Sequence, residues 1–320
     1  MATGPCQLVA DIGATHARFA LARDGVLTGD KTTLATGEQT RAVDLLETAL
    51  DQLGAESISA GCFAVAGPVG EGWVEVTNGG LRFDARELST AAGAPVRLVN
   101  DFFALATAVP ALQTLETIGG DPGREKSAEV KAVVGPGSGL GMSILVPGEG
   151  ESERRWQVLP SEGGHADLAP GNPLEQELLN ILHSQHNGVC WETVLSGPGL
   201  VNLHQAVAVM WGMPADPLTP EEISRRGASV EDPLCHQTLE LFFALLGSAA
   251  GNLALTVCAQ GGVYIGGGIV PRLIEFAKSS PMRRRFEERV ELDALVADIP
   301  IFLILDEDPG LIGAAACCPR

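Results

Sequence analysis

The order of apolar and polar positions in the first third of the chain predicts short strands separated by turns. A run of apolar residues over 7–11 meets Gly13 and resumes over 17–22, so a glycine turn joins two strands and opens no helix. Apolar residues at helical spacing predict a helix over 40–53. Further strands are expected over 27–34, 57–66 and 96–99, and a second helix over 102–109. This pattern indicates an α/β protein without strict βαβ alternation.

The strand, glycine turn and strand recur later in the chain, over 130–134, 135–141 and 142–146. The recurrence predicts a duplicated architecture whose division lies near Val109. A polar stretch with glycine and proline over 119–127 predicts a surface loop. The second part is expected to hold helices over 173–186, 199–210 and 232–259, then a strand over 299–305, a turn over 308–310 and a helix from 311.

Residues 241–270 carry no charged side chain, and their length satisfies the hydropathy criterion for a membrane span. Glycines interrupt this stretch at 261–262 and 266–268. A lone span broken by such turns is a poor membrane anchor. We therefore expect a buried helix, a turn, a buried strand over 263–265 and a glycine turn in a soluble protein.

Composition narrows the class of protein. The chain has 320 residues, 45% of them hydrophobic, which is typical of an ordered globular protein. Its net charge of -19 opposes binding to nucleic acids and to anionic membranes. The same charge repels ATP, so a nucleotide site must use backbone N–H groups and a metal ion. Seven cysteines without a C-x-x-C pair, and a start without signal-peptide features, predict reduced thiols in the cytoplasm.

Three glycine turns are candidate nucleotide contacts. In the first, Gly13 lets a ligand approach the backbone, Thr15 offers a hydroxyl, and Asp11 could hold Mg²⁺ through water; an ordinary hairpin is the alternative. The second, over 135–141, has four glycines at alternate positions, which cost conformational entropy that a plain hairpin need not lose. Neither turn matches a P-loop or a dinucleotide-binding fingerprint. The third, over 266–268, has the form of a close approach to a flat base.

Polar residues after other predicted strands are candidates for catalysis and sugar binding. Asn100 and Asp101 follow a strand, where a carboxylate could act as a base; a helix N-cap is the alternative role. Glu162 and His165 enclose two glycines, and Glu192 precedes a Ser-Gly-Pro-Gly turn. Such side chains suit sugar hydroxyls. The histidines at 183, 186, 204 and 236 are expected to be surface or packing residues, and the arginines at 283–285 to lie on a solvated helix face.

These motifs, taken in order, resemble the bacterial glucokinase family, the hexokinase-like branch of the actin/sugar-kinase ATPase superfamily. The resemblance extends over 8–316 and rests on motifs at 11–18, 66–68, 77–78, 100–102, 135–141, 162–165, 195–200, 266–268 and 309–313. It implies a two-domain actin-like ATPase (ribonuclease H-like) α/β fold with an interdomain cleft. The small domain would contain 1–109 and 306–320, because the C-terminal helix returns to it, and the large domain 110–305.

The resemblance also implies an activity and its residues. A glucokinase transfers the γ-phosphate of ATP to the 6-hydroxyl of glucose with Mg²⁺, usually as a cytoplasmic homodimer. Asp101 would be the general base. The implied sugar-binding residues are Asn78, Asn100, Asp101, Glu162, His165 and Glu192. The implied nucleotide contacts are Ala10, Asp11, Ile12, Gly13, Ala14, Thr15, Gly137, Ser138, Gly139, Gly266, Gly267 and Gly268.

Two departures from the family pattern bear on nucleotide binding. The first turn usually reads Gly-Gly-Thr, and Ala14 would be strained if its φ had to be positive. Ser138 stands where threonine is usual and keeps the hydroxyl.

The competing function is a non-catalytic sugar-sensing regulator on the same fold, and a third possible function is a chaperone-type ATPase. No DNA-binding motif precedes residue 8, the Cys-rich zinc motif of the sister repressor/kinase group is absent, and the extra domain of a chaperone is lacking.

Overall fold

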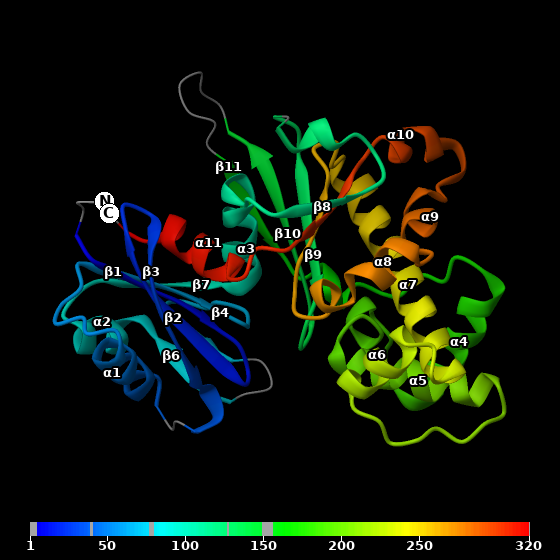
Figure 1. The fold of residues 1–320 in the computed structure, drawn as a ribbon, viewed down its shortest axis with the longest axis horizontal. Coiled ribbons are helices and arrows are strands. Elements are labelled where there is room, and N and C mark those ends of the chain that lie inside the picture. The colour runs from blue at the N-terminus through cyan, green and yellow to red at the C-terminus, as the bar shows by residue number, and fades with distance from the viewer. Residues whose placement is uncertain (1–4, 39–40, 77–79, 127, 149–155, 320) are drawn as a thin grey trace. The chain divides into compact units, whose positions relative to one another are not determined.

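The computed structural model describes residues 5–38, 41–76, 80–126, 128–148 and 156–319. The chain forms two compact units (Figure 1). Unit 1 contains residues up to Gln113 and those from Asp306, and unit 2 contains Thr114–Leu305. Unit 1 therefore extends past Val109, through a 3₁₀ turn, Val109–Ala111, that continues helix α3 (Asp101–Ala108).

Unit 1 is built on a five-stranded sheet in the order β3-β2-β1-β4-β7. The strands are β1 (Gln7–Ile12), β2 (His16–Arg23), β3 (Val26–Ala35), β4 (Ala60–Val65) and β7 (Val96–Asn100). β2 is antiparallel to both β1 and β3, whereas β1, β4 and β7 are parallel. Because parallel strands end at one edge of a sheet, the residues that follow β1, β4 and β7 lie side by side there.

Alternation along the strands separates the two faces of this sheet. Leu8, Ala10 and Ile12 of β1 share a buried cluster with α1 (Ala42–Gln52) and with Leu88 of α2 (Ala85–Ala92). Val9 lies in a second cluster with residues of α11 (Pro309–Cys317). Asp11 is two residues from Val9 along β1, so its side chain lies on the same face of the sheet, where α11 begins. The sequence pattern thus sends its carboxylate to the α11 face.

Unit 2 is built on a six-stranded sheet in the order β11-β10-β9-β12-β13-β8. The strands are β8 (Leu115–Ile118), β9 (Lys131–Pro136), β10 (Leu140–Pro147), β11 (Trp156–Ser161), β12 (Val263–Ile265) and β13 (Ile301–Ile304). Counted from the β11 edge, its first five strands repeat both the order and the directions of the strands in unit 1. The predicted duplication is therefore confirmed, with β8 as an added antiparallel edge strand.

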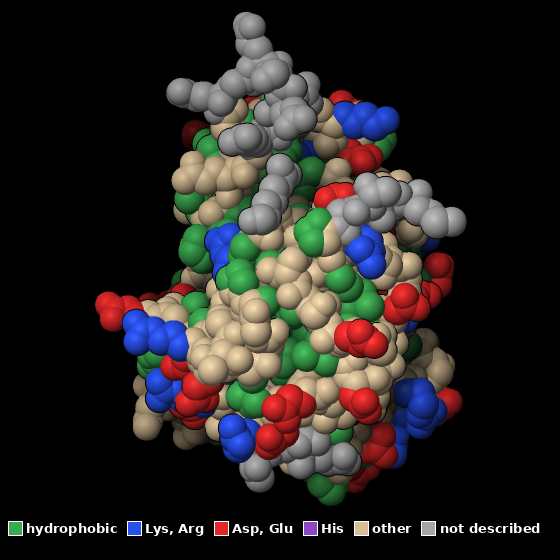
Figure 2. Space-filling view, turned by 90° about the vertical axis from the view of Figure 1, so that its left-hand side faces the viewer, with side chains coloured by type: hydrophobic (Ala, Val, Ile, Leu, Met, Phe, Trp, Pro, Cys, Tyr) green, Lys and Arg blue, Asp and Glu red, His purple; other side chains and the backbone are tan. Residues whose placement is uncertain are grey.

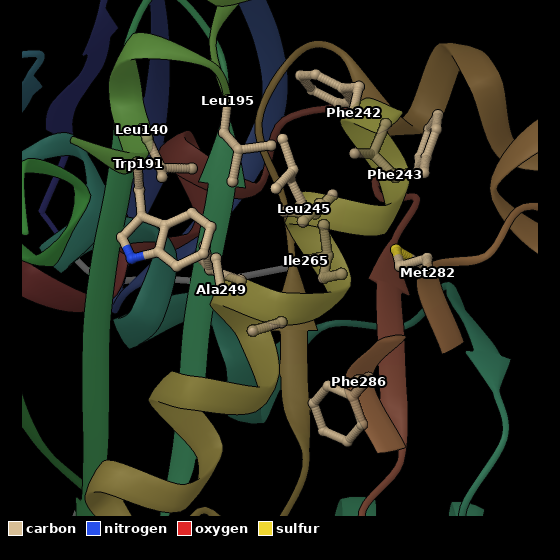
Figure 3. Close-up of a cluster of buried hydrophobic side chains, with 14 of the residues drawn as sticks. Leu140, Trp191, Leu195, Phe242, Phe243, Leu245, Ala249, Ile265, Met282 and Phe286 are labelled. Carbon is tan, nitrogen blue, oxygen red and sulfur yellow. The ribbon is translucent and has the colours of Figure 1, made fainter. Parts of the chain in front are cut away.

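The uncharged stretch becomes helix α7 (Pro233–Val257), then a turn and β12, as expected. By length and apolar composition α7 could cross a membrane, but 67% of its most apolar window is buried within the structure. Its aromatic residues Phe242 and Phe243 belong to the same buried cluster as Trp191 and Ile265 (Figure 3). The helix is the core of unit 2.

The remaining helices and strands were only partly foreseen. α4 (Pro173–Gln185) and α5 (Gly197–Met210) match expectation; α6 (Pro220–Ala228), α8 (Ile274–Ser279), α9 (Met282–Glu287), α10 (Asp293–Ala297) and the hairpin of β5 (Trp73–Glu75) and β6 (Arg82–Asp84) had no prediction. Short 3₁₀ helices occupy Thr36–Glu38, Val109–Ala111, Pro122–Lys126, Gly163–His165, Trp191–Thr193, Val270–Leu273 and Val290–Leu292.

The expectation of a solvated arginine face over 283–285 is wrong for two of the three residues. Arg284 is exposed, but Arg285 is 7% exposed and forms an ion pair with the buried Glu175 at 2.9 Å. Arg283 donates to the carbonyl oxygens of Ile118 and Ile299.

Exposed charge is mixed in sign. On the face in Figure 2, acidic and basic side chains are interspersed among the described residues without a continuous basic patch.

Candidate functional site

The first glycine turn follows β1 at the carboxyl edge of the unit 1 sheet. Gly13 N–H donates to the carbonyl of His16 at 2.9 Å, which closes the turn. The buried Thr36, just after β3, holds the turn through two hydrogen bonds. Its hydroxyl donates to the Gly13 carbonyl at 3.0 Å, and its N–H donates to the Thr15 carbonyl at 3.0 Å. Thr36 was not foreseen, since only the register of β2 with β3 brings it to the turn.

Ala14 is not strained. Among the described non-glycine residues, positive φ occurs at Asp24, Val230, Cys258 and Val290, and not at Ala14. Its methyl group packs against the cluster beneath the sheet. The expected conflict between this methyl and a left-handed backbone is therefore wrong, and alanine is compatible with the turn.

Asp11 lies under this turn in an environment that disfavours its charge. Burial raises the pKa of the Asp11 carboxyl; the Arg18 guanidinium, 3.6 Å away, opposes the rise, and the like charge of Asp308 adds to it. Gly310, at the start of α11, leaves room for the carboxylate, because a Cβ there would lie 2.7 Å from Asp11 Oδ2. The folded protein therefore holds a carboxylate whose ionised form costs stability.

We expect Asp11→Asn to stabilise the protein at pH 7, measured without nucleotide or magnesium. The folded pKa is raised, so the ionised carboxylate destabilises the fold above that pKa and the penalty disappears as pH falls through it. The difference in melting temperature between variant and parent should accordingly shrink as the pH is lowered toward 4. Asp232→Asn is the control with opposite sign, because hydrogen bonds from the N–H groups of Cys235 and Leu234 outweigh burial and lower the pKa of that carboxyl. Destabilisation by Asp11→Asn at pH 7 would mean that the Arg18 contact outweighs burial.

Asn100 and Asp101 stand where β7 passes into α3, at the same sheet edge. Asn100 caps the helix: its Oδ1 accepts from the N–H groups of Phe102 and Phe103 at 2.9 and 3.1 Å. Its Nδ2 donates to the Gly67 carbonyl at 3.1 Å and to Asp101 Oδ1 at 3.0 Å. The alternative role as N-cap thus holds for Asn100, and the same amide orients the neighbouring carboxylate.

The second glycine turn joins β9 to β10 at the carboxyl edge of the unit 2 sheet. Gly137 N–H donates to the Gly139 carbonyl at 2.8 Å, and the Gly137 carbonyl accepts from Gly197 N–H at 2.8 Å. Glu192 also reaches this turn, because its Oε2 accepts from Leu140 N–H at 2.7 Å. One of the predicted sugar-binding carboxylates is therefore bonded to the backbone of a predicted phosphate-binding turn.

Glu162 and His165 are exposed residues at the two ends of a 3₁₀ turn that packs on the start of β10. This packing requires glycine, because a Cβ at Gly164 would lie 2.0 Å from the Leu140 carbonyl oxygen. His165 Nδ1 lies 4.0 Å from Cys190 Sγ, in the segment before Glu192. Unit 2 thus brings together Glu162, His165 and Glu192 around the second glycine turn.

The space around the glycines separates those that the fold requires from those that it does not. A Cβ at Gly135 would lie 2.7 Å from Gly266, one at Gly139 would meet the Glu192 carboxylate, and one at Gly267 would meet Pro136. By contrast, a Cβ at Gly137 or Gly268 would meet no described atom within 4 Å, and the contact at Gly13 is an ordinary 3.6 Å. Packing does not explain glycine at 13, 137 and 268, which leaves their backbones open to a ligand.

The other expected contacts are placed as follows. Ala10 and Ile12 are buried strand residues beneath the first turn, Thr15 and Ser138 are exposed on the turns, and Gly266 lies beside β9, donating its N–H to the Val134 carbonyl at 3.0 Å. Asn78 lies outside the described residues. Asp308 and Gly310, which the individual motifs did not flag, complete the first site; their signal was the Asp-Pro-Gly start of α11.

Each unit has a glycine turn at the carboxyl edge of its sheet, and comparison with known proteins shows the family to which such a chain belongs. A glucokinase family profile matches residues 8–320. The chain belongs to the glucokinase family. A glucokinase of Chromobacterium violaceum is 42% identical over 313 residues, covering 97% of this chain and 88% of that protein.

Solved structures agree with membership in the glucokinase family. The crystal structure of a glucokinase from an Antarctic psychrotroph has a TM-score of 0.82 and 35% identity, covering 98% of both chains. A ROK family glucokinase from Streptomyces griseus, solved with glucose and AMPPNP, has a TM-score of 0.67 at 19% identity, which shows a common fold. The expected family and the two-domain actin-like ATPase fold class are thus confirmed, and glucokinase relatives favour an enzyme over a regulator.

Proposed function

We propose that this chain transfers the γ-phosphate of ATP to the 6-hydroxyl of glucose, giving glucose 6-phosphate and ADP. The observation that supports this best is the Asp101 carboxylate at the start of α3, oriented by Asn100 in a chain of the glucokinase family. Asp101 takes the proton from the 6-hydroxyl of glucose as the hydroxyl oxygen attacks the γ-phosphorus. The bond from that phosphorus to the β–γ bridging oxygen breaks, and ADP leaves.

Sugar selection is assigned to the remaining polar residues near the two sheet edges. Glu162, His165 and Glu192 offer acceptors and a ring N–H to the other hydroxyls. Both amide hydrogens of Asn100 are already donated, so it contacts the sugar only by exchanging its bond to Gly67. Asn78 is proposed on the family resemblance alone. A sugar hydroxyl on Glu192 would compete with Leu140 N–H, which couples sugar binding to the second glycine turn.

The three glycine turns are assigned to ATP. The N–H groups of Gly13 and Gly137 are donated within their own turns, so the neighbouring N–H groups of Ala14, Thr15, Ser138 and Gly139, with the Thr15 and Ser138 hydroxyls, hold phosphate oxygens. Ala10, Asp11 and Ile12 position the first turn, and Gly266 to Gly268 lie against the base. Mg²⁺ prefers oxygen ligands and keeps much of its water. The Asp11 carboxylate is 25% exposed, so it can accept hydrogen bonds from water bound to the ion. When bound, the ion neutralises phosphate charge during transfer.

We expect Gly137→Ala to weaken ATP binding without destabilising the fold. A Cβ there meets no described atom within 4 Å, and φ is not in the left-handed region, so the variant folds normally. If a phosphate approaches this backbone, the methyl group blocks it, and KM for ATP should rise about tenfold while the melting temperature stays within about 2 °C. Gly37→Ala, which adds a methyl in equally open space at 36–38, is the control. An unchanged KM for ATP would remove Gly137 from the nucleotide site.

Steady-state ADP release across glucose, mannose and glucosamine tests the function. Glucose-dependent release that requires Mg²⁺ supports a kinase. Sugar binding without turnover would instead favour the sugar-sensing regulator, and sugar-independent ATP hydrolysis would favour another ATPase. Glucose 6-phosphate formation, followed by mass, distinguishes transfer to sugar from hydrolysis by water.

We further propose that the enzyme is a cytoplasmic homodimer that serves glycolysis. The family resemblance and the seven unpaired cysteines, four of them buried, support a reducing compartment. Sedimentation of the purified protein tests the dimer, and a monomer at enzyme-assay concentration would contradict it.

A further inference from the structure

A separate cavity in unit 2 is lined by arginines. It has a volume of about 500 Å³ and lies among α7, the loop before α4 and the segment from α9 to α10. Its lining residues are Ala169, Pro170, Gly171, Ser248, Asn252, Arg285, Glu288, Arg289, Val290 and Asp293. None of them belongs to the proposed sugar or nucleotide contacts, so the cavity has no role in the proposed reaction.

Three buried polar atoms in the cavity's lining residues have no hydrogen-bond partner within the described structure. They are Arg285 Nε, Arg289 Nε and Ser248 Oγ. Arg285 is 7% exposed and Ser248 is 5% exposed, so these side chains depend on partners inside the protein. Both arginine atoms can only donate, and the serine hydroxyl can do so. Each of these atoms has less than 1 Å² of accessible surface, so an occupant of the cavity would meet the Nη groups of the two arginines and not these atoms.

The charge of Arg289 is also less well compensated than that of Arg285. Arg285 is matched by Glu175 at 2.9 Å and by Glu288 at 2.5 Å. Arg289 donates to two carbonyl oxygens, those of Glu288 and Ser248, at 2.7 and 3.0 Å, and has no ion pair among the described residues. Burial and the neighbouring Arg285 lower the pKa of Arg289, and the Glu288 carboxylate only partly opposes this. An anion beside Arg289 would relieve this repulsion.

The two acidic residues of the lining do not fill that role. Glu288 Oε2 already accepts from Arg285, and its Oε1 lies 3.7 Å from Arg284. Asp293 Oδ1 accepts from the N–H of Ala294 at 2.8 Å, at the start of α10. Their negative charge would hold a loosely bound anion away, so an occupant must gain its affinity from directed hydrogen bonds to guanidinium groups.

The arginines are fixed in place by close helix packing. Gly251 of α7 makes room for Arg289, because a Cβ there would lie 2.1 Å from Nη2. Gly247, one turn earlier, similarly admits the backbone of Met282 in α9. Met282 and Phe286 are drawn beside α7 in Figure 3, on the segment that leads to Arg289. Val290, which follows Arg289, has a φ of 53°, a left-handed conformation unfavourable to a β-branched residue, and is 90% exposed.

We propose that this cavity is a binding site for a small phosphate-type oxyanion, either free phosphate or the phosphoryl group of a small metabolite. Arg289 supplies the charge and the main hydrogen bonds, through the Nη hydrogens that its two carbonyl contacts leave, and Arg285 adds positive charge beside it. The volume exceeds that of free phosphate, which leaves space for the rest of a small phosphorylated molecule. Binding needs neither sugar nor ATP, so it is independent of the proposed function.

Calorimetric titration of the full chain, at constant ionic strength and without sugar or ATP, tests the site. The probes are inorganic phosphate, glycerol 3-phosphate and acetate. We expect saturable binding of a phosphate probe and none of acetate. Arg289→Gln should weaken it at least about tenfold, since a hydrogen bond to a charged group is lost. Tighter binding of glycerol 3-phosphate than of inorganic phosphate would identify the metabolite as the occupant, and the reverse would identify free phosphate.

Two further variants keep the test decisive. Asn252→Asp places a carboxylate on an exposed lining residue with little risk to folding, and should also weaken binding. Arg284→Gln removes an exposed arginine of α9 that does not line the cavity, and should leave binding unchanged. Equal binding by all variants would place the phosphate elsewhere, such as at the glycine turns, and would overturn the proposal. So would an absence of saturable binding.

Discussion

Replacing Asp101 by asparagine should lower turnover roughly 10²–10⁴-fold, the usual contribution of a general base. The amide cannot take the proton of the 6-hydroxyl, whereas its shape is nearly that of the carboxylate. The helix should survive the change, because the cap comes from Asn100 and not from Asp101. Glucose binding, followed by calorimetry, should therefore persist while the rate of ADP release collapses.

Asp44→Asn is the matched control, since Asp44 is also a carboxylate in the first turn of a unit 1 helix, α1. It should keep parental turnover. Turnover within about threefold of the parent in Asp101→Asn would place the base elsewhere, and loss of both binding and turnover would point to a sugar contact rather than proton transfer.

The largest effect on stability is expected from Gly313→Ala. Gly313 lies in α11 where it packs on α3, and a Cβ there would lie 1.8 Å from the carbonyl oxygen of Ala104. Neither backbone can yield without separating the two helices, so the cost should reach about 3 kcal/mol, the upper part of the range for overpacking. Because α3 begins at Asp101, turnover should fall as well.

Chemical denaturation measures this cost, with Gly37→Ala as the control. The control adds the same methyl group in open space and should change the free energy of unfolding by less than about 1 kcal/mol. Equal stability of the two variants would show that α11 can move away from α3 without loss, which would remove the proposed link between its packing and the position of Asp101.

Local patterns predicted the parts of the fold that depend on neighbouring residues. The apolar run before Gly13 and its continuation after it gave β1, β2 and their turn, and the repeat at 135–141 gave the matching hairpin of unit 2. Likewise, Asn-Asp after a strand predicted either a helix cap or a catalytic carboxylate, and Asn100 is the cap. These features need only periodicity and turn chemistry.

Contacts between distant segments were not predictable in this way. Arg285 looked solvated because its partner Glu175 lies 110 residues earlier, and Glu192 gave no sign that it would accept from Leu140, 52 residues away. The short hairpin of β5 and β6 has only three residues in each strand, too few to show alternation. Asp308 reaches the first turn only through the return of the chain to unit 1.

That return of the chain has a consequence for synthesis on the ribosome. The sheet of unit 1 is complete by residue 100, but the cluster containing Val9 and Ala64 is closed by Leu311 and Ala314 of α11. Roughly 200 residues of unit 2 are made in between, which takes about 10–40 s at ordinary elongation rates. During this interval only α3 covers this apolar face of the nascent sheet, while unit 2 can close as soon as its own residues emerge. The segment that bears Asp101 is therefore made early and secured last.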